Sequence, residues 1–105
     1  MNKLIKMSIN VIDVQSLLND DFQKAAKEIQ SLQSFEKLDN TVLLELYSYY
    51  KQVIIGDNKT SQPSFLDFKG QAKWSAWNGR KGMKKETAQV KYIKLVAKIL
   101  DNFNV

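Results

Sequence analysis

Apolar residues recur at steps of three and four along four stretches of this chain, and no alternating apolar and polar run of useful length competes with them. Such spacing places apolar side chains on one face of an α-helix, whereas a half-buried strand requires alternation. A chain of 105 residues is ordinarily one domain with a small core. The sequence therefore predicts an all-α domain of four helices.

Residues that favour helix ends bound the first two predicted helices. Helix one is predicted from Asp20 or Asp21, whose carboxylates suit an N-cap and the helix dipole. Helix two is predicted to begin at the capping residues Asp39 to Thr41 and to stop at Gly56. The predicted apolar faces are Phe22, Ala25, Ala26, Ile29 and Leu32 in helix one, and Leu43, Leu46, Tyr47, Tyr50 and Ile54 in helix two.

The second half of the chain follows the same pattern after a long connection. Residues 56–64 hold the only proline and many turn formers, which predicts an ordered overhand loop. Helix three is predicted over residues 67–80, with Gly82 marking its end, and helix four runs from near Lys84 almost to the C-terminus. Their apolar residues are Phe68, Ala72, Ala76 and Trp77, followed by Ala88, Tyr92, Leu95, Val96, Ile99 and Phe103.

The chain contains neither cysteine nor histidine. This excludes a thiolate nucleophile, an imidazole base and the commonest transition-metal ligands. Sixteen basic against eleven acidic residues give a net charge of +5, and every basic residue except Arg80 is a lysine. Lysine meets phosphate as a point charge, whereas bidentate reading of guanine prefers arginine. We therefore expect anion binding rather than catalysis, with no catalytic residue, metal or cofactor.

The predicted organisation is an N-terminal extension over residues 1–18, of unassigned role, and a domain over residues 19–105. No apolar run approaches the roughly 18 residues needed to span a bilayer, and Lys6 and Asp13 interrupt the apolar N-terminal stretch. We accordingly expect a soluble protein of the cytoplasm. An alternative hypothesis makes residues 1–18 an anchor or docking segment for a membrane or a partner protein.

One surface of helix two carries the first candidate binding cluster. Tyr47, Tyr50 and Lys51 occupy positions i, i+3 and i+4, which makes two phenols and an ammonium neighbours. A phenol can stack on a purine and donate to phosphate, and Lys73 from helix three could join Lys51 around one phosphate. The alternative is that the tyrosines belong to the core or its boundary beside a solvated lysine. Tyr92 is equally compatible with a core role and with donation to a ligand.

Trp74 and Trp77 lie three residues apart in helix three. They could anchor the core or form a platform for nucleic-acid bases. Because Ala72 and Ala76 interleave with them as helix packing requires, we expect mainly structural roles. The competing function is a basic nucleic-acid module that uses both tryptophans and the lysines, with strongly salt-dependent binding to single strands.

Taken in order, these pieces closely resemble the acyl-CoA-binding proteins. The resemblance rests on LLELYSYYKQVIIGD, on Pro63 seven residues after Gly56, on LDFKGQAKWSAWNGRKGM and on KETAQVKYIKLV. It also covers FQKAAKEIQSL, and so extends from about Phe22 to Leu100.

The resemblance implies a four-helix bundle with up-down-down-up topology. It implies non-covalent binding of long-chain fatty acyl-CoA esters by a monomeric intracellular carrier and pool-former in lipid metabolism, without enzymatic activity. Acyl-CoA-using enzymes or membrane surfaces are then transient partners, and nucleic acid is not a partner. The positions implied to hold the adenine ring and 3′-phosphate of CoA are Tyr47, Tyr50, Lys51, Lys73 and Tyr92. Those implied to line the acyl chain are Ala26, Leu43 and Leu44.

The chain departs from the family pattern at a few positions. Gln30 stands one turn after Ala26, where many members have a lysine that contacts the ligand, so that contact is expected to be weaker here. Gln62, before Pro63, replaces a residue that is frequently basic. The stretch between Leu32 and Leu43 is about two residues longer than usual and lacks the usual proline.

Overall fold

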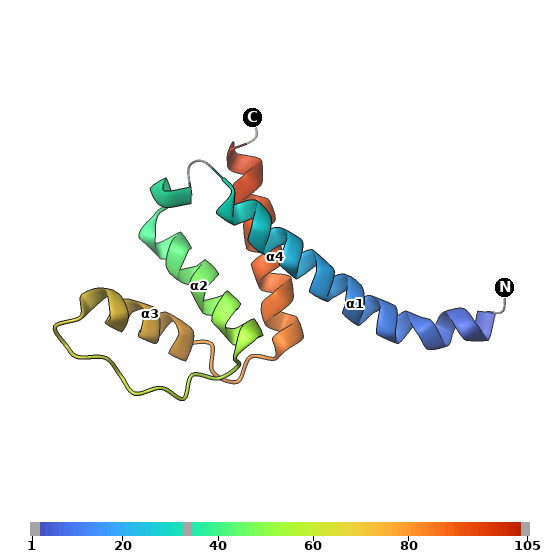
Figure 1. Ribbon diagram of the computed structural model, residues 1–105, viewed down its shortest axis with the longest axis horizontal. Coiled ribbons are helices and arrows are strands. Elements are labelled where there is room, and N and C mark those ends of the chain that lie inside the picture. The colour runs from blue at the N-terminus through green and yellow to red at the C-terminus, as the bar shows by residue number, and fades with distance from the viewer. Residues whose placement is uncertain (1–2, 33–34, 104–105) are drawn as a thin grey trace.

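The computed structural model describes residues 3–32 and 35–103, with side chains described from Gln15 onward except that of Glu36. Residues 1–2 of the predicted extension, 33–34 of the connection after helix one and 104–105 lie outside the described residues. The described chain forms α1 (Lys3–Gln30), the short 3₁₀ helix η1 (Phe35–Lys37), α2 (Asn40–Ile54), α3 (Phe68–Asn78) and α4 (Lys85–Phe103). These residues contain no strand, which confirms the all-α prediction (Figure 1).

The centre of the bundle is formed by α2 and α4. α4 packs against both α1 and α2, and α2 also packs against α3. Figure 1 shows α2 and α3 running in similar directions, joined by a long loop over residues 55–67, while α1 and α4 run the opposite way. This is the up-down-down-up bundle that the resemblance implied.

α1 begins at Lys3, so the prediction that helix one starts at Asp20 or Asp21 is wrong. Neither proline nor glycine occurs between Lys3 and these acids, and nothing else there ends a helix. Because the helix continues through them, the following backbone N–H groups have intrahelical partners and need no cap. α1 therefore crosses the predicted boundary between residues 18 and 19 unbroken, and the division into extension and domain stays a prediction.

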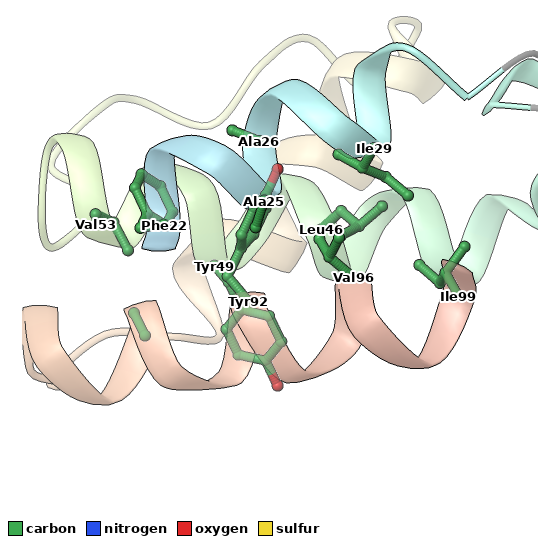
Figure 2. Close-up of a cluster of buried hydrophobic side chains, with 11 residues drawn as sticks. Phe22, Ala25, Ala26, Ile29, Leu46, Tyr49, Val53, Tyr92, Val96 and Ile99 are labelled. Carbon is green, nitrogen blue, oxygen red and sulfur yellow. The ribbon is translucent and has the colours of Figure 1, made fainter. Parts of the chain in front are cut away.

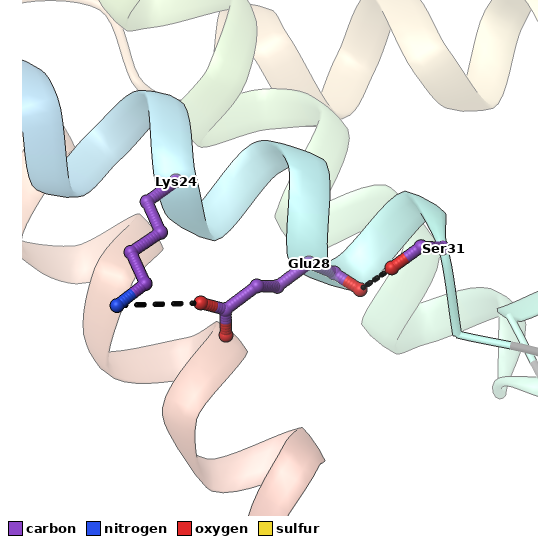
Figure 3. A network of polar contacts seen from close by, with 3 residues as sticks. All are labelled: Lys24, Glu28 and Ser31. Carbon is purple, nitrogen blue, oxygen red and sulfur yellow. Dashed lines mark hydrogen bonds and ion pairs between the residues drawn. The ribbon is translucent and has the colours of Figure 1, made fainter.

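The exposed face of α1 carries an ion pair between Lys24 Nζ and Glu28 Oε1 at 3.8 Å (Figure 3). One turn later the Ser31 hydroxyl donates to the Glu28 carbonyl at 2.9 Å. Such an exposed pair contributes less than about 1 kcal/mol. Within the described side chains it is the only ion pair, so the lysines Lys51 and Lys73 have no carboxylate partner there.

Side-chain caps mark the starts of α2 and α3, and a glycine follows the end of α2. Asp39 caps α2 by accepting from the Thr41 amide at 3.0 Å, and Asp67 caps α3 by accepting from the Gly70 amide at 2.9 Å. Gly56 follows the end of α2 with φ = +95°, a conformation that costs glycine little. The cap at Asp39 and the stop at Gly56 confirm the predictions, whereas the cap at Asp67 was not predicted from the sequence.

α3 ends two residues before the predicted limit, at Asn78 rather than Arg80. After it the chain continues in turns with i to i+3 hydrogen bonds: the Arg80 amide donates to the Trp77 carbonyl and the Met83 amide to the Arg80 carbonyl, both at 2.9 Å. Gly82 lies in this turn with φ = +89°, and α4 starts at Lys85, one residue from the prediction.

The core lies where α1, α2 and α4 meet, as Figure 2 shows. Its buried members are Phe22, Ala25, Ala26, Ile29, Leu46, Tyr49, Val53, Ala88, Tyr92, Val96 and Ile99. The predicted faces of α1 and α4 are thus largely confirmed. Phe103 is the exception on α4, because it sits at the helix end and is 47% exposed.

The prediction for α2 placed the core face one residue off. Leu46, Tyr49 and Val53 face the core at steps of three and four, whereas Ile54 is exposed. Tyr47 and the neighbouring Tyr50 are half-buried beside that face. Since α1 and α4 cover one side of α2, the tyrosines occupy the boundary between core and solvent.

Both tryptophans of α3 tie the long loop to the bundle. Trp77 is buried and its Nε1 donates to the Gly56 carbonyl at 2.8 Å. Trp74 is half-buried and its Nε1 donates to the Thr60 carbonyl at 3.0 Å. The expected structural roles and the ordered loop are confirmed. A buried Trp77 also leaves no exposed indole pair for stacking bases.

Candidate functional site

A pocket of about 240 Å³ opens between α1, η1, α2 and α4. It is lined by Ile29, Gln30, Phe35, Leu43, Leu46, Tyr47, Tyr50 and Tyr92. Three of these residues are tyrosines and four are aliphatic or phenylalanine side chains. The pocket is therefore an apolar cavity with phenols in its wall, which suits a ligand with an apolar portion.

Stacked and tilted rings support the pocket from beneath. The Phe22 ring centroid lies 5.7 Å from that of Tyr50 and 5.0 Å from that of Tyr92, and the two tyrosine centroids are 6.0 Å apart. These separations are typical of favourable aromatic pairs. Because the three rings come from α1, α2 and α4, packing of the bundle fixes the orientation of Tyr50.

The hydroxyl of Tyr92 stays protonated under all ordinary conditions. Burial raises the pKa of Tyr92 to about 12, and the charge of nearby Tyr50 acts in the same direction. Among the described residues no hydrogen bond reaches this hydroxyl. Tyr92 can therefore donate a hydrogen bond to an oxygen that enters the pocket.

Two lysines from different helices approach the ring of Tyr47. Nζ of Lys51 lies 5.9 Å from the Tyr47 ring centroid and 5.0 Å from that of Trp77, and Nζ of Lys73 lies 5.6 Å from the Tyr47 centroid. Each ammonium is within the range of a cation–π contact. We call Tyr47, Lys51 and Lys73 the basic cluster.

The electrostatics of the basic cluster favour an anion beside it. Its two ammonium groups repel each other across one ring, and no described carboxylate forms an ion pair with either. An anion bound between them removes this repulsion. Since Tyr47 also lines the pocket, the basic cluster and the apolar cavity are contiguous.

Comparison with known proteins identifies the family and the fold. The family described as acyl-CoA-binding protein matches this chain over residues 19–96. The chain belongs to that family. It is 45% identical over 84 residues to a putative acyl-CoA-binding protein of a Hypsibius species, across 80% of this chain and 92% of the relative. It is 42% identical to an acyl-CoA-binding protein homolog of Drosophila melanogaster, across 76% and 91%.

Solved structures of the family share the fold. The crystal structure of Oryza sativa acyl-CoA-binding protein 2 superposes with a TM-score of 0.77 at 31% identity, covering 83% of this chain and 94% of that one. The crystal structure of the protein from Moniliophthora perniciosa gives 0.72 at 34% identity, covering 83% and 84%.

The remaining positions that the family resemblance implied lie in and around this pocket. Leu43 and Gln30 line it, and Gln30 is exposed. Leu44 is half-buried and stands outside the lining. Ala26 is 7% exposed and belongs to the core beneath, also outside the lining. The structure thus brings the predicted tyrosines together with Leu43 in the pocket wall. Ala26 and Leu44 are not part of that wall.

Three lining residues were not assigned to the site from the sequence of this acyl-CoA-binding protein. Ile29 and Leu46 were predicted only as core residues, and they reach the pocket because it opens directly above the core. Phe35 lies in η1, within a stretch that is otherwise polar. The only sequence signal for a role of Phe35 in the pocket was its position as a single phenylalanine among polar residues.

No described group of three or more acidic, histidine or cysteine side chains could hold a metal ion. None of the helices within the described residues is long and apolar enough to cross a membrane.

Proposed function

We propose that this protein binds long-chain fatty acyl-CoA esters non-covalently and serves as a carrier and pool-former in lipid metabolism. The observation that supports this proposal best is that Tyr47 belongs both to the apolar pocket and to the basic cluster. An acyl-CoA ester joins a hydrocarbon tail to an anionic nucleotide, so its binding site must offer both environments side by side. Membership in the acyl-CoA-binding protein family supports the same ligand.

In this proposal the head group of CoA occupies the basic cluster and the adjoining phenols. Lys51 and Lys73 bind the 3′-phosphate, and Tyr47 and Tyr50 hold the adenine ring, which can stack on a phenol face. Tyr92 donates its hydroxyl proton to a ligand oxygen. Support comes from the shared position of both ammonium groups over one ring, at 5.6 and 5.9 Å from its centroid.

The acyl chain occupies the apolar part of the pocket beside Leu43, with Leu44 and Ala26 in contact along its path. Each methylene removed from water contributes about 0.8 kcal/mol, so the tail supplies much of the affinity. The head group supplies orientation and selectivity for the CoA ester over a free fatty acid. The mouth of the pocket beside Gln30 has one positive charge fewer than many family members.

The chemistry of the site fits a carrier that leaves the thioester intact. Its described polar side chains are phenols, ammonium groups and the Gln30 amide, and burial raises the pKa of Tyr92 so that its phenol stays protonated far above neutral pH. A phenol or an ammonium that keeps its proton is a poor nucleophile. We propose that the protein is not an enzyme, requires no cofactor or metal and acts as a monomer in the cytoplasm. Acyl-CoA-using enzymes or membrane surfaces exchange ligand with it transiently.

Titration calorimetry with palmitoyl-CoA, free CoA and palmitate tests this function. We expect palmitoyl-CoA to bind most tightly, because it alone fills both the pocket and the basic cluster. Free CoA should bind weakly through the head group, and palmitate should bind weakly or not at all. Equal affinity for palmitate and its CoA ester would show that the basic cluster does not recognise the nucleotide.

A further inference from the structure

The turn that leads into α3 carries large apolar side chains that are exposed to solvent. Phe65, Leu66 and Phe68 are 77%, 72% and 80% exposed, more than any other large hydrophobic residue that the structure describes. Together they expose roughly 400 Å² of apolar surface, which is within the size range of the largest apolar patch on a typical monomer, a patch that is often functional. We call these three residues the apolar tip.

The apolar tip is an ordered feature. The Asp67 amide donates to the Ser64 carbonyl at 2.9 Å, and the Leu66 amide donates to the Ser64 hydroxyl oxygen at 3.2 Å. α3 then starts at Phe68 with its N-cap formed. In Figure 1 the start of α3 lies at the left edge of the molecule, far from the N-terminal end of α1. The fold therefore holds these exposed side chains on a hydrogen-bonded turn at one end of the molecule.

Positive charge surrounds the apolar tip. Residues 58–77 contain the lysines Lys59, Lys69 and Lys73 and a single acidic residue, Asp67. All three lysines are exposed. The Asp67 carboxylate accepts the Gly70 amide and so faces the N-terminus of α3, where the helix dipole favours its charge. A surface that meets the tip is thus favoured when it is anionic.

We propose that the apolar tip docks on anionic lipid bilayers, with its three side chains in the interfacial region and the flanking lysines against the headgroups. Stable membrane association ordinarily needs both an apolar and a basic component, and the tip supplies both. A stable protein interface buries about 800 Å² per partner on complementary surfaces, roughly twice what the tip offers. A small apolar patch flanked by lysines suits a deformable anionic lipid surface instead.

This docking deepens the transient exchange of ligand with membrane surfaces, and its role rests on that proposed function; it names the surface that makes the contact. It also places the proposed ligand site relative to the membrane. Lys73 follows Lys69 by one turn on the same helix and belongs to the basic cluster. A protein docked by its tip therefore holds the ligand site close to the bilayer surface, where an amphipathic ester partitions.

Vesicle sedimentation tests the proposal. The full chain is mixed with vesicles of phosphatidylcholine and phosphatidylserine, or with vesicles of phosphatidylcholine alone. We expect binding to the mixed vesicles, weaker binding to the neutral ones, and release by added salt, because salt screens the lysines. The double variant Phe65→Ser, Phe68→Ser should lower the partition coefficient by at least about tenfold, because it removes two inserted rings.

The matched control is Leu17→Ser, Phe103→Ser, which removes one leucine and one phenylalanine that are exposed by 60% and 47% elsewhere on the molecule. Its partition should equal that of the unaltered chain. The single variant Phe65→Ser, in a turn outside any helix, serves if the double variant loses its helical circular dichroism.

Absence of vesicle binding by the unaltered chain overturns the proposal, and so does equal binding by the tip variants. Loss of binding in the Leu17 and Phe103 control places the docking surface elsewhere and overturns it as well. The affinity of the tip variants for palmitoyl-CoA should be unchanged. Calorimetry therefore detects a failure of ligand binding, and vesicle sedimentation detects a failure of docking, independently of each other.

Discussion

Substitution of Lys73 by alanine isolates the contribution of the basic cluster to ligand binding. Lys73 is exposed, sits in the middle of α3 and holds its Nζ 5.6 Å from the Tyr47 ring centroid. Alanine is the best helix former and the lysine side chain is not part of the core. The variant should therefore keep the stability of the unaltered protein within about 0.5 kcal/mol.

The loss of affinity follows from the charges. A unit charge pair at about 4 Å in a watery environment contributes about 1 kcal/mol, and a phosphate monoester carries nearly two charges at neutral pH. Screening by salt and the ordering of a long side chain reduce this gain. Lys73→Ala should thus cost about 1 to 2 kcal/mol of binding free energy, which is roughly a five- to thirtyfold rise in Kd for palmitoyl-CoA.

Calorimetry on a ligand and protein cycle measures this effect. The unaltered protein and Lys73→Ala are each titrated with palmitoyl-CoA and with its 3′-dephospho analogue. If Lys73 binds the 3′-phosphate, the two losses are not additive, because either change alone removes the same interaction. The difference between the two proteins should nearly vanish for the dephospho ligand.

Lys69→Ala is the charge-matched control. Lys69 is exposed one turn earlier on α3, and in the described part of the chain the ammonium groups over the Tyr47 ring are those of Lys51 and Lys73. The control should bind palmitoyl-CoA almost normally. Equal losses for Lys69→Ala and Lys73→Ala would mean that only net charge matters, and additive losses in the cycle would remove Lys73 from the phosphate site.

Two further substitutions probe the pocket. Gln30→Lys should lower the Kd for palmitoyl-CoA by about three- to tenfold. Residue 30 is exposed at the pocket, so the ammonium of the introduced lysine can reach the anionic head group. An effect no larger than that of Gln23→Lys, a substitution on the same helix, would refute this. Burial raises the pKa of Tyr92 from 10.0 to about 12, so the folded state favours the neutral phenol. The resulting stability is complete below pH 10 and lost as pH rises to 12, by at most about 2 to 3 kcal/mol. Urea unfolding of Tyr92→Phe should show a flatter alkaline decline, and parallel curves would contradict it.

Local signals in the sequence were sufficient where the structure depends on local chemistry. Asp39 caps the helix that it was predicted to cap, and Gly56 ends α2 in the conformation that glycine tolerates. Tyr50 of α2 meets Tyr92 of α4 because these two helices pack against each other in the bundle. Such features depend on neighbours within a few residues, or on the family pattern.

Other features depend on competition that a sequence does not display. Asp20 has the chemistry of an N-cap, but capping matters only where a helix starts, and α1 starts at Lys3. On α2 both Tyr47 and Tyr49 are possible core residues by composition. Contact with α1 and α4 selects Tyr49, and this rotation of the helix by one residue is decided by tertiary packing.

The orientation of α2 also determines which substitutions change ligand affinity without changing the stability of the fold. The rings of Tyr50 and Tyr92 pack on Phe22, so these tyrosines belong to the core as well as to the pocket. Lys51 and Lys73 contact the site only through ring faces and lie outside the core. A loss of affinity after truncation of Tyr92 therefore mixes unfolding with lost ligand contact, since only folded protein binds. The lysine variants leave the core intact, and their affinities measure recognition of the nucleotide directly.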